Sequence, residues 1–171
     1  MKLSSLQSTE YDTYYKPYIE ALGEVDLLNE LEHSFITFID FLKTIPTEKL
    51  EYRYAEGKWT IKDIVQHLID AERIFAYRAL RIARKDQTPL PGFEENEYVE
   101  TAFANNRTME DLIEEFTIVR KATLSLFKTF TEEQLMQMGT ASEKPVSVRA
   151  IGFITLGHQK HHEKIIKERY L

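Results

Sequence analysis

The chain has 171 residues, 43% of them hydrophobic, which suffices for one packed core, so we expect a single domain over residues 1–171. With 6 glycines and 5 prolines it has few turn residues, which disfavours a β-sandwich or barrel, and without cysteine it excludes disulfides, thiolate metal sites and a cysteine nucleophile. Its net charge is −6, and the sequence contains no stripe of basic residues, so we expect no nucleic-acid partner and no membrane partner.

The amino-terminal part is rich in tyrosine (Tyr11, Tyr14, Tyr15 and Tyr18), and we expect residues 1–25 to form an arm or short helix across the domain. No signal peptide is apparent there. The most apolar stretch, residues 150–156, is far shorter than the roughly 20 residues that a membrane helix needs. We therefore expect a cytoplasmic protein.

Four segments show the periodicity of amphipathic helices. The first covers residues 26–43 and ends before Pro46, with His33 on its polar, exposed face. The second runs from Thr60 to about Arg84, and the third starts at Thr108. Both begin with the spacing of a capping box. The fourth runs from about Ser147 to the last residues, so the pattern predicts an all-α, four-helix bundle.

Two connections between these helices are informative. Residues 44–59 end with the only tryptophan, Trp59, which could pack against the start of the second helix. Residues 86–107 form a connection between the second and third helices that far exceeds the usual 2–8 residues of bundle loops. A connection of that length is typically functional or partly helical.

Histidines in the fourth helix carry the strongest chemical signal. His158 and His162 are four residues apart and are bracketed by an apolar stripe, so both imidazoles are expected to point into the core. A divalent cation would explain the pair, because the two nitrogens face one point. The alternative is two core histidines, each hydrogen-bonded to a carbonyl or carboxylate. His161 lies on the flank and is expected to be a neighbour of this pair.

A catalytic metal site needs a third ligand and an open position, and His67 in the second helix is the remaining inward-facing candidate. Asp63 and Asp70 flank it at helical spacing and could orient its ring, replace it as ligand, or be plain surface charges.

Glu72 lies in the apolar stripe of the same helix. A buried carboxylate needs a cation. Arg149 and Arg53 are possible partners, and the choice is between a structural ion pair and a role in the site.

Several enzyme motifs are absent. Glu-x-x-His occurs once, at Glu30 and His33 on the polar face, which argues against a ferritin-like di-iron centre. There is no His-Glu-x-x-His, no G-x-S-x-G, no P-loop and no dinucleotide fingerprint.

The chain resembles the DinB-like superfamily over about residues 25–171. The resembling motifs are Gly57-Lys58-Trp59-Thr60-Ile61-Lys62-Asp63 leading to His67, and Gly157-His158 followed by His161-His162. The resemblance implies an up-down-up-down bundle with a long connection between helices two and three, metal ligands at His67, His158 and His162, and a homodimer.

Function varies within this family, which includes bacillithiol S-transferases, a mycothiol-dependent isomerase and domains of thiol-histidine biosynthesis enzymes. We expect zinc or nickel at three imidazoles with an open position. Such a centre could bind a low-molecular-weight thiol for S-transfer to an electrophile, with residues 86–107 lining the pocket. It could instead activate water, as a metal-dependent hydrolase does. A third interpretation is a non-catalytic dimeric binding module.

Overall fold

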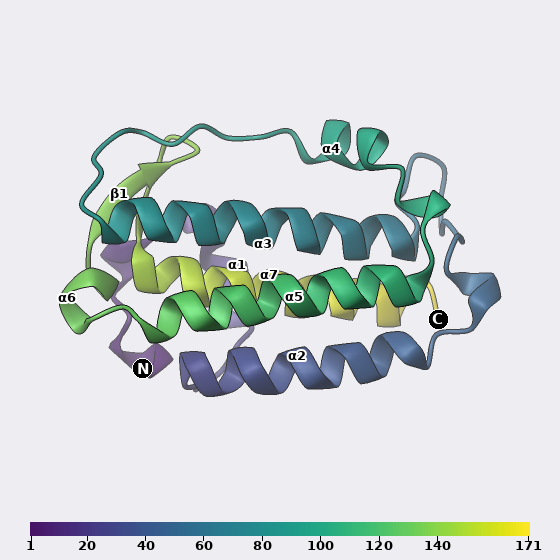
Figure 1. The fold of residues 1–171 in the computed structure, drawn as a ribbon, viewed down its shortest axis with the longest axis horizontal. Helices are drawn as coiled ribbons and strands as arrows, with labels where there is room; N and C mark the ends of the chain where they lie inside the picture. The colour runs from purple at the N-terminus through teal and green to yellow at the C-terminus, as the bar shows by residue number, and fades with distance from the viewer.

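The computed structural model describes residues 1–171 and confirms the four-helix bundle (Figure 1). Its long helices are α2 (Leu27–Lys43), α3 (Ile61–Ala83), α5 (Met109–Lys128) and α7 (Val148–Arg169). Each begins after a side chain that accepts a hydrogen bond from a backbone N–H of the first turn, at Asp26, Thr60, Thr108 and Ser147. Only Thr60 has the complete capping box, in which the Asp63 carboxylate accepts from the Thr60 N–H. No helix combines the length and apolar composition that crossing a bilayer would require.

The directions of the four helices differ from the expected up-down-up-down order. Helices α3 and α5 are parallel, since Arg107 contacts Gln66 near their starts and Glu115 contacts Arg73 further along both. Helix α7 is antiparallel to α3, because the Tyr170 hydroxyl at its end donates to the Trp59 carbonyl just before α3. As Figure 1 shows, α2 and α7 run one way and α3 and α5 the other. The order is up-down-down-up.

The long connection explains this order. Residues 84–108 run back along the whole of α3, which at 23 residues is about 34 Å long, so that α5 starts at the same end as α3. Leu90 pairs with Thr140 at the far end of α3, and Asn105 contacts Asp63 at its start. The connection contains α4 (Glu95–Ala102) and the 3-10 turn η5 (Ala104–Asn106), so it is partly helical as predicted.

A hairpin between α5 and α7 has no counterpart in the sequence analysis. Helix α6 (Glu132–Leu135) leads into strands β1 (Met138–Ala141) and β2 (Lys144–Ser147), which pair antiparallel with Ala141 opposite Lys144. The two turn residues, Ser142 and Glu143, have φ of 51° and 63°. Turns of this kind usually carry Asn or Gly, and this one carries neither, so the sequence offers no hairpin signal.

The amino-terminal residues pack across the bundle as an arm. They form 3-10 turns η1 (Leu3–Ser5), η2 (Ser8–Glu10) and η3 (Thr13–Tyr15) and helix α1 (Lys16–Glu20), and a further turn, η4 (Thr47–Lys49), follows α2. Glu10 anchors the arm, since its carboxylate accepts hydrogen bonds from Ser147 and Arg149 at the start of α7. A Cβ on Gly157 would lie 2.2 Å from the Tyr18 carbonyl oxygen, so the missing side chain lets α1 dock directly on α7.

The interior contains one ion pair, between Glu72 of α3 and Arg120 of α5. The Arg120 Nε and Nη2 atoms donate to the two Glu72 oxygens at 2.8 and 2.9 Å, and Nη1 donates to the Leu31 carbonyl of α2. Arg120 is fully buried and Glu72 is 3% exposed. The partners considered from the sequence, Arg149 and Arg53, were wrong, because they pair with Glu10 and Asp63.

Candidate metal centre

Three histidines from two helices converge near the middle of the bundle. His67 lies on α3, and His158 and His162 lie one turn apart on α7. The Nε2 atoms of His67 and His158 are 3.0 Å apart, and one nitrogen of each ring lies within 4.8 Å of the others. The antiparallel contact between α3 and α7 therefore brings together the three histidines that the spacing selected.

Burial keeps these imidazoles neutral. None of the three is more than 9% exposed. Burial lowers the pKa of His67 to about 4, and burial together with the neighbouring histidines lowers the pKa of His162 to about 3. The pKa of His158 is lowered by burial and then by the charges of His162, His67 and His161. Each ring is thus unprotonated at neutral pH and has a lone pair to offer.

One nitrogen of the cluster has no partner in the protein. The Nδ1 atom of His162 is buried and makes no hydrogen bond, which is costly for a polar atom. No carboxylate is hydrogen-bonded to any of the three rings. A divalent cation fits this donor set, because neutral imidazoles bind zinc-like ions at about 2.0–2.1 Å and would lie about 3.3 Å apart around it. The residues present fit a metal.

Aromatic side chains form the walls of the cluster. The Trp59 ring is 4.8 Å from His67 and is stacked on His162 at an interplanar angle of 17°. Phe75 lies 5.7 Å from His158 on the other side. Tyr18 of α1 makes edge contacts with His158 and His161. These rings restrict water around the histidines and fix their orientation.

A cavity of about 420 Å³ opens beside the histidines. Its lining comes from the arm, α3, the long connection, the hairpin and α7. Gly92 and Phe93 represent the long connection, which bears out the expectation that this segment lines the pocket. His161 also lines the cavity and is exposed, as expected of a neighbour, and His33 is exposed on α2.

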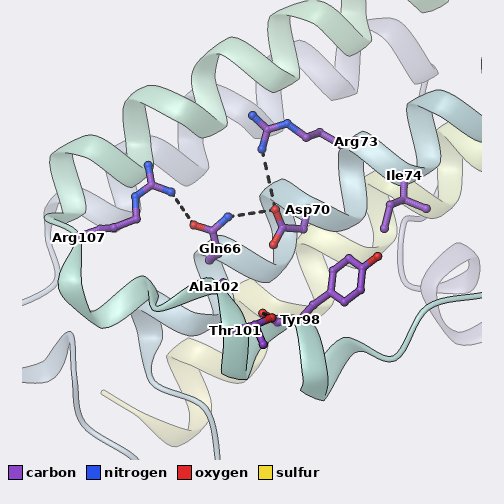
Figure 2. A pocket seen from close by; sticks show the side chains of 8 residues that line it. All are labelled: Gln66, Asp70, Arg73, Ile74, Tyr98, Thr101, Ala102 and Arg107. Atoms are coloured by element: carbon purple, nitrogen blue, oxygen red, sulfur yellow. Dashed lines mark hydrogen bonds and ion pairs between the residues drawn. The ribbon is translucent and has the colours of Figure 1, made fainter.

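Asp63 and Asp70 do not reach the cluster. Asp63 is buried, but its carboxylate caps α3 and binds Asn105 and Arg53. Asp70 points into a different hollow of about 500 Å³ between α3, α4 and α5, where Gln66 donates to it at 3.1 Å (Figure 2). Burial raises the pKa of Asp70. Glu72 has both oxygens occupied by Arg120, so it makes no contact with the histidines either.

The hollow in Figure 2 contains two arginines that already have protein partners. Arg107 and Arg73 both pair with Glu115 of α5, the latter at 2.5 Å, and Arg107 also donates to Gln66 at 2.6 Å. The charges of this hollow are satisfied within the protein. It therefore gives no indication of a ligand.

Two residues of the cavity escaped the sequence analysis. Trp59 was interpreted only as a packing residue at the start of α3; it does pack there, and it also covers two of the histidines. Arg78 was not singled out, although it lies on α3 11 positions after His67, which is about three turns and so the same face. That periodicity was the available signal for Arg78.

Comparison with known proteins agrees with this geometry. A family model described as the DinB superfamily matches residues 30–166. A protein of Oceanobacillus iheyensis with the provisional name of metal-dependent hydrolase is 27% identical over 128 residues, which is 74% of this chain and 73% of the relative. A protein of Geobacillus thermodenitrificans with the same provisional name is 28% identical over 117 residues, 67% of this chain and 66% of that protein.

Two solved structures from Bacillus subtilis share the fold. YfiT, described as "a probable metal-dependent hydrolase with an unusual four-helix bundle topology", superposes with a TM-score of 0.75 at 16% identity, covering 83% of this chain and 82% of YfiT. The DinB-like protein YjoA superposes with a TM-score of 0.58 at 18% identity, covering 82% and 86% of the two chains. At these identities the likeness concerns the fold alone.

Proposed function

The chain belongs to the DinB superfamily, and on that premise we propose that it is a metal-dependent enzyme that holds one divalent cation through His67, His158 and His162. The observation that carries the proposal is the convergence of three buried, neutral imidazoles, one with an unpartnered nitrogen, at the edge of a cavity. Imidazole ligands suit zinc or nickel. When bound, such a cation supplies a Lewis acid with an open position, which ionises a water or thiol near neutral pH and polarises a carbonyl oxygen.

The residues around the three histidines hold the imidazole rings in place and shape the cavity beside them. His67 on one helix and His158 and His162 on the antiparallel neighbour are fixed by Trp59, Phe75 and Tyr18, so their positions need little rearrangement. The cavity of about 420 Å³ admits a small molecule to the same edge of the cluster. The apolar rings exclude bulk water and thereby strengthen electrostatic interactions in the site.

We propose hydrolysis of a small molecule as the reaction. Support comes from the two relatives with the provisional name of metal-dependent hydrolase. Thiol S-transfer is the second candidate. It is favoured by the family resemblance, and the chain has no cysteine of its own to fill the open position of the centre.

Metal analysis of protein purified without a histidine tag tests the site. We expect about one divalent ion per chain in the wild type and in His33→Ala, and none in the His158→Ala/His162→Ala double variant. His33 is the matched control, since it is an exposed histidine that does not belong to the cluster. Equal metal content in the wild type and the double variant would refute the assignment.

Product analysis separates the two reactions. The metal-loaded protein is offered a small ester with and without a low-molecular-weight thiol. Free acid formed without thiol supports hydrolysis, whereas a thioester formed only with thiol supports S-transfer. A metal-loaded protein that turns over neither type of substrate would favour a non-catalytic binding module.

A further inference from the structure

Arg78 is a buried cation without an anionic partner. It is 4% exposed, and its Nη2 atom donates to the Pro91 carbonyl at 2.7 Å and to the Ser142 hydroxyl at 2.9 Å. Both acceptors are neutral. Its Nε and Nη1 atoms donate to no protein acceptor, and the residue lines the cavity beside the histidines.

The other buried cations of the chain are neutralised. Lys62 pairs with Glu51 at 2.7 Å, and Arg120 pairs with Glu72 at 2.8 Å. The half-buried Arg149 pairs with Glu10. A buried charge that has no counterion destabilises the fold. Arg78 is therefore the exception in a protein that otherwise pairs its buried charges.

A second cation lines the same cavity. Lys144 of β2 is half-buried, its Nζ lies 5.2 Å from the centre of the Tyr14 ring, and it has no carboxylate within ion-pair distance. The one acidic residue in the lining is Glu95, which is exposed. The lining is thus positive although the whole chain carries a net charge of −6. Such a local excess attracts anions.

The position of Arg78 relates it to the histidines. It follows His67 by 11 positions on α3, which is about three turns or roughly 16 Å along the axis, on the same face. Ala71 and Phe75, which also line the cavity, lie between them. Arg78 and the three histidines line this one cavity, so the guanidinium and the imidazoles border the same space. A ligand of several bonds could contact both ends of this apolar floor.

We propose that this cavity takes a small molecule with an anionic group, a carboxylate or a phosphate, which Arg78 and Lys144 bind while the reacting end lies at the three histidines. The inference rests on the proposed function, since it names the substrate class of the same site. The three free N–H groups of Arg78 on Nε and Nη1 suit the oxygens of such a group.

Binding of simple anions to the metal-free protein tests the anion site directly. Isothermal titration calorimetry is performed with succinate and inorganic phosphate, and with succinamide as the neutral control. We expect saturable binding of succinate, phosphate or both, and none of succinamide. Phosphate binding alone would identify the group as a phosphate, and succinate binding alone would identify it as a carboxylate. Equal binding of succinate and succinamide, or binding of neither anion, would overturn the proposal.

Variants assign the binding to its residues. Arg78→Gln should weaken anion binding by about tenfold to a hundredfold, the usual effect of losing a hydrogen-bonded charge. Arg73→Gln is the matched control, because Arg73 lies on α3 in the separate hollow of Figure 2 and should bind as the wild type does. Lys144→Gln is the second variant, in case Arg78→Gln does not fold. It leaves the Arg78 hydrogen bonds intact, and we expect it to bind the anions more weakly than the wild type. Unchanged affinity in folded Arg78→Gln and in Lys144→Gln would overturn the proposal.

A second measurement separates this inference from the proposed function. The metal-loaded protein is assayed with monophenyl suberate, in which a chain of methylenes separates a free carboxylate from the ester, and with phenyl octanoate, which has no carboxylate. A higher kcat/KM for the charged ester that is lost in Arg78→Gln supports the inference. Equal hydrolysis of both esters retains the function and overturns the substrate class. If the protein binds succinate but cannot be loaded with metal, the anion site stands and the proposed metal-dependent function is refuted.

Discussion

The Nε2 atoms of His67 and His158 lie 3.0 Å apart although 91 positions of sequence separate the two residues. This contact exists because α7 runs antiparallel to α3 and packs along it. The proposed metal centre is thus part of the packing between two helices, and we expect loss of a bound metal to lower the stability of the whole fold.

We expect bound metal to raise stability. A ligand that binds only the folded state adds about 2.7 kcal/mol when its concentration is one hundred times Kd. Adding a strong chelator to the metal-loaded protein should therefore lower Tm, and His162→Ala should abolish this response. His33→Ala should respond as the wild type does. An unchanged Tm after chelation would contradict a metal bound at this centre.

The metal-free protein should lose stability as the solution is acidified. The pKa of His67 falls from 6.5 in the unfolded chain to about 4 in the fold, and that of His162 to about 3. Because the folded values are the lower ones, below pH 6.5 the unfolded state binds protons that the folded state does not. Above pH 6.5 these histidines do not lower the free energy of unfolding. As the pH falls below 6.5, each of them lowers that free energy by up to about 1.4 kcal/mol per pH unit.

Urea unfolding of the metal-free protein at pH 7.5 and 5.5 measures this decline. The decline should be shallower in His67→Gln, which removes one of the titrating groups. A free energy of unfolding that rises on acidification would contradict the neutral, buried state of these rings.

The Glu72–Arg120 pair predicts a strong asymmetry between single and double substitutions. Removing one partner leaves an uncompensated charge in the core, which costs about 3–5 kcal/mol. Glu72→Met or Arg120→Met should therefore lower the free energy of unfolding by an amount in that range. The Glu72→Met/Arg120→Met double variant should lose less than the sum, because no charge remains buried. Additive losses in a double-mutant cycle would show that the pair is not coupled.

Gly157 should be intolerant of a side chain even though it lies within a helix. Alanine normally stabilises a helix by about 1 kcal/mol relative to glycine. Here its Cβ would lie 2.2 Å from the Tyr18 carbonyl oxygen, so α1 must move away from α7. We expect Gly157→Ala to lower stability by about 1–3 kcal/mol, as overpacking does. A circular dichroism melt measures it, and a variant at least as stable as the wild type would contradict this docking of α1.

The sequence determined the helices and the candidate ligands because both are local patterns. Apolar periodicity located α2, α3, α5 and α7, and capping-box spacing at Thr60 and Thr108 marked two of their starts. The spacing of His158 and His162 placed both rings on one face of one helix, which is independent of the rest of the fold. The sequence also showed how long the connection between α3 and α5 is. It did not show that this connection runs back along α3.

Only the tertiary structure decided which helices are neighbours, and with them the partner of each buried group. The up-down-down-up order places Arg120 beside Glu72, whereas the sequence alone offered Arg149 and Arg53 as equally reasonable partners. The same order places the hairpin and the long connection beside Arg78, which donates hydrogen bonds to Ser142 of the hairpin and Pro91 of the connection. Periodicity describes one element at a time, while an ion pair or a cavity depends on the packing of several elements distant in sequence.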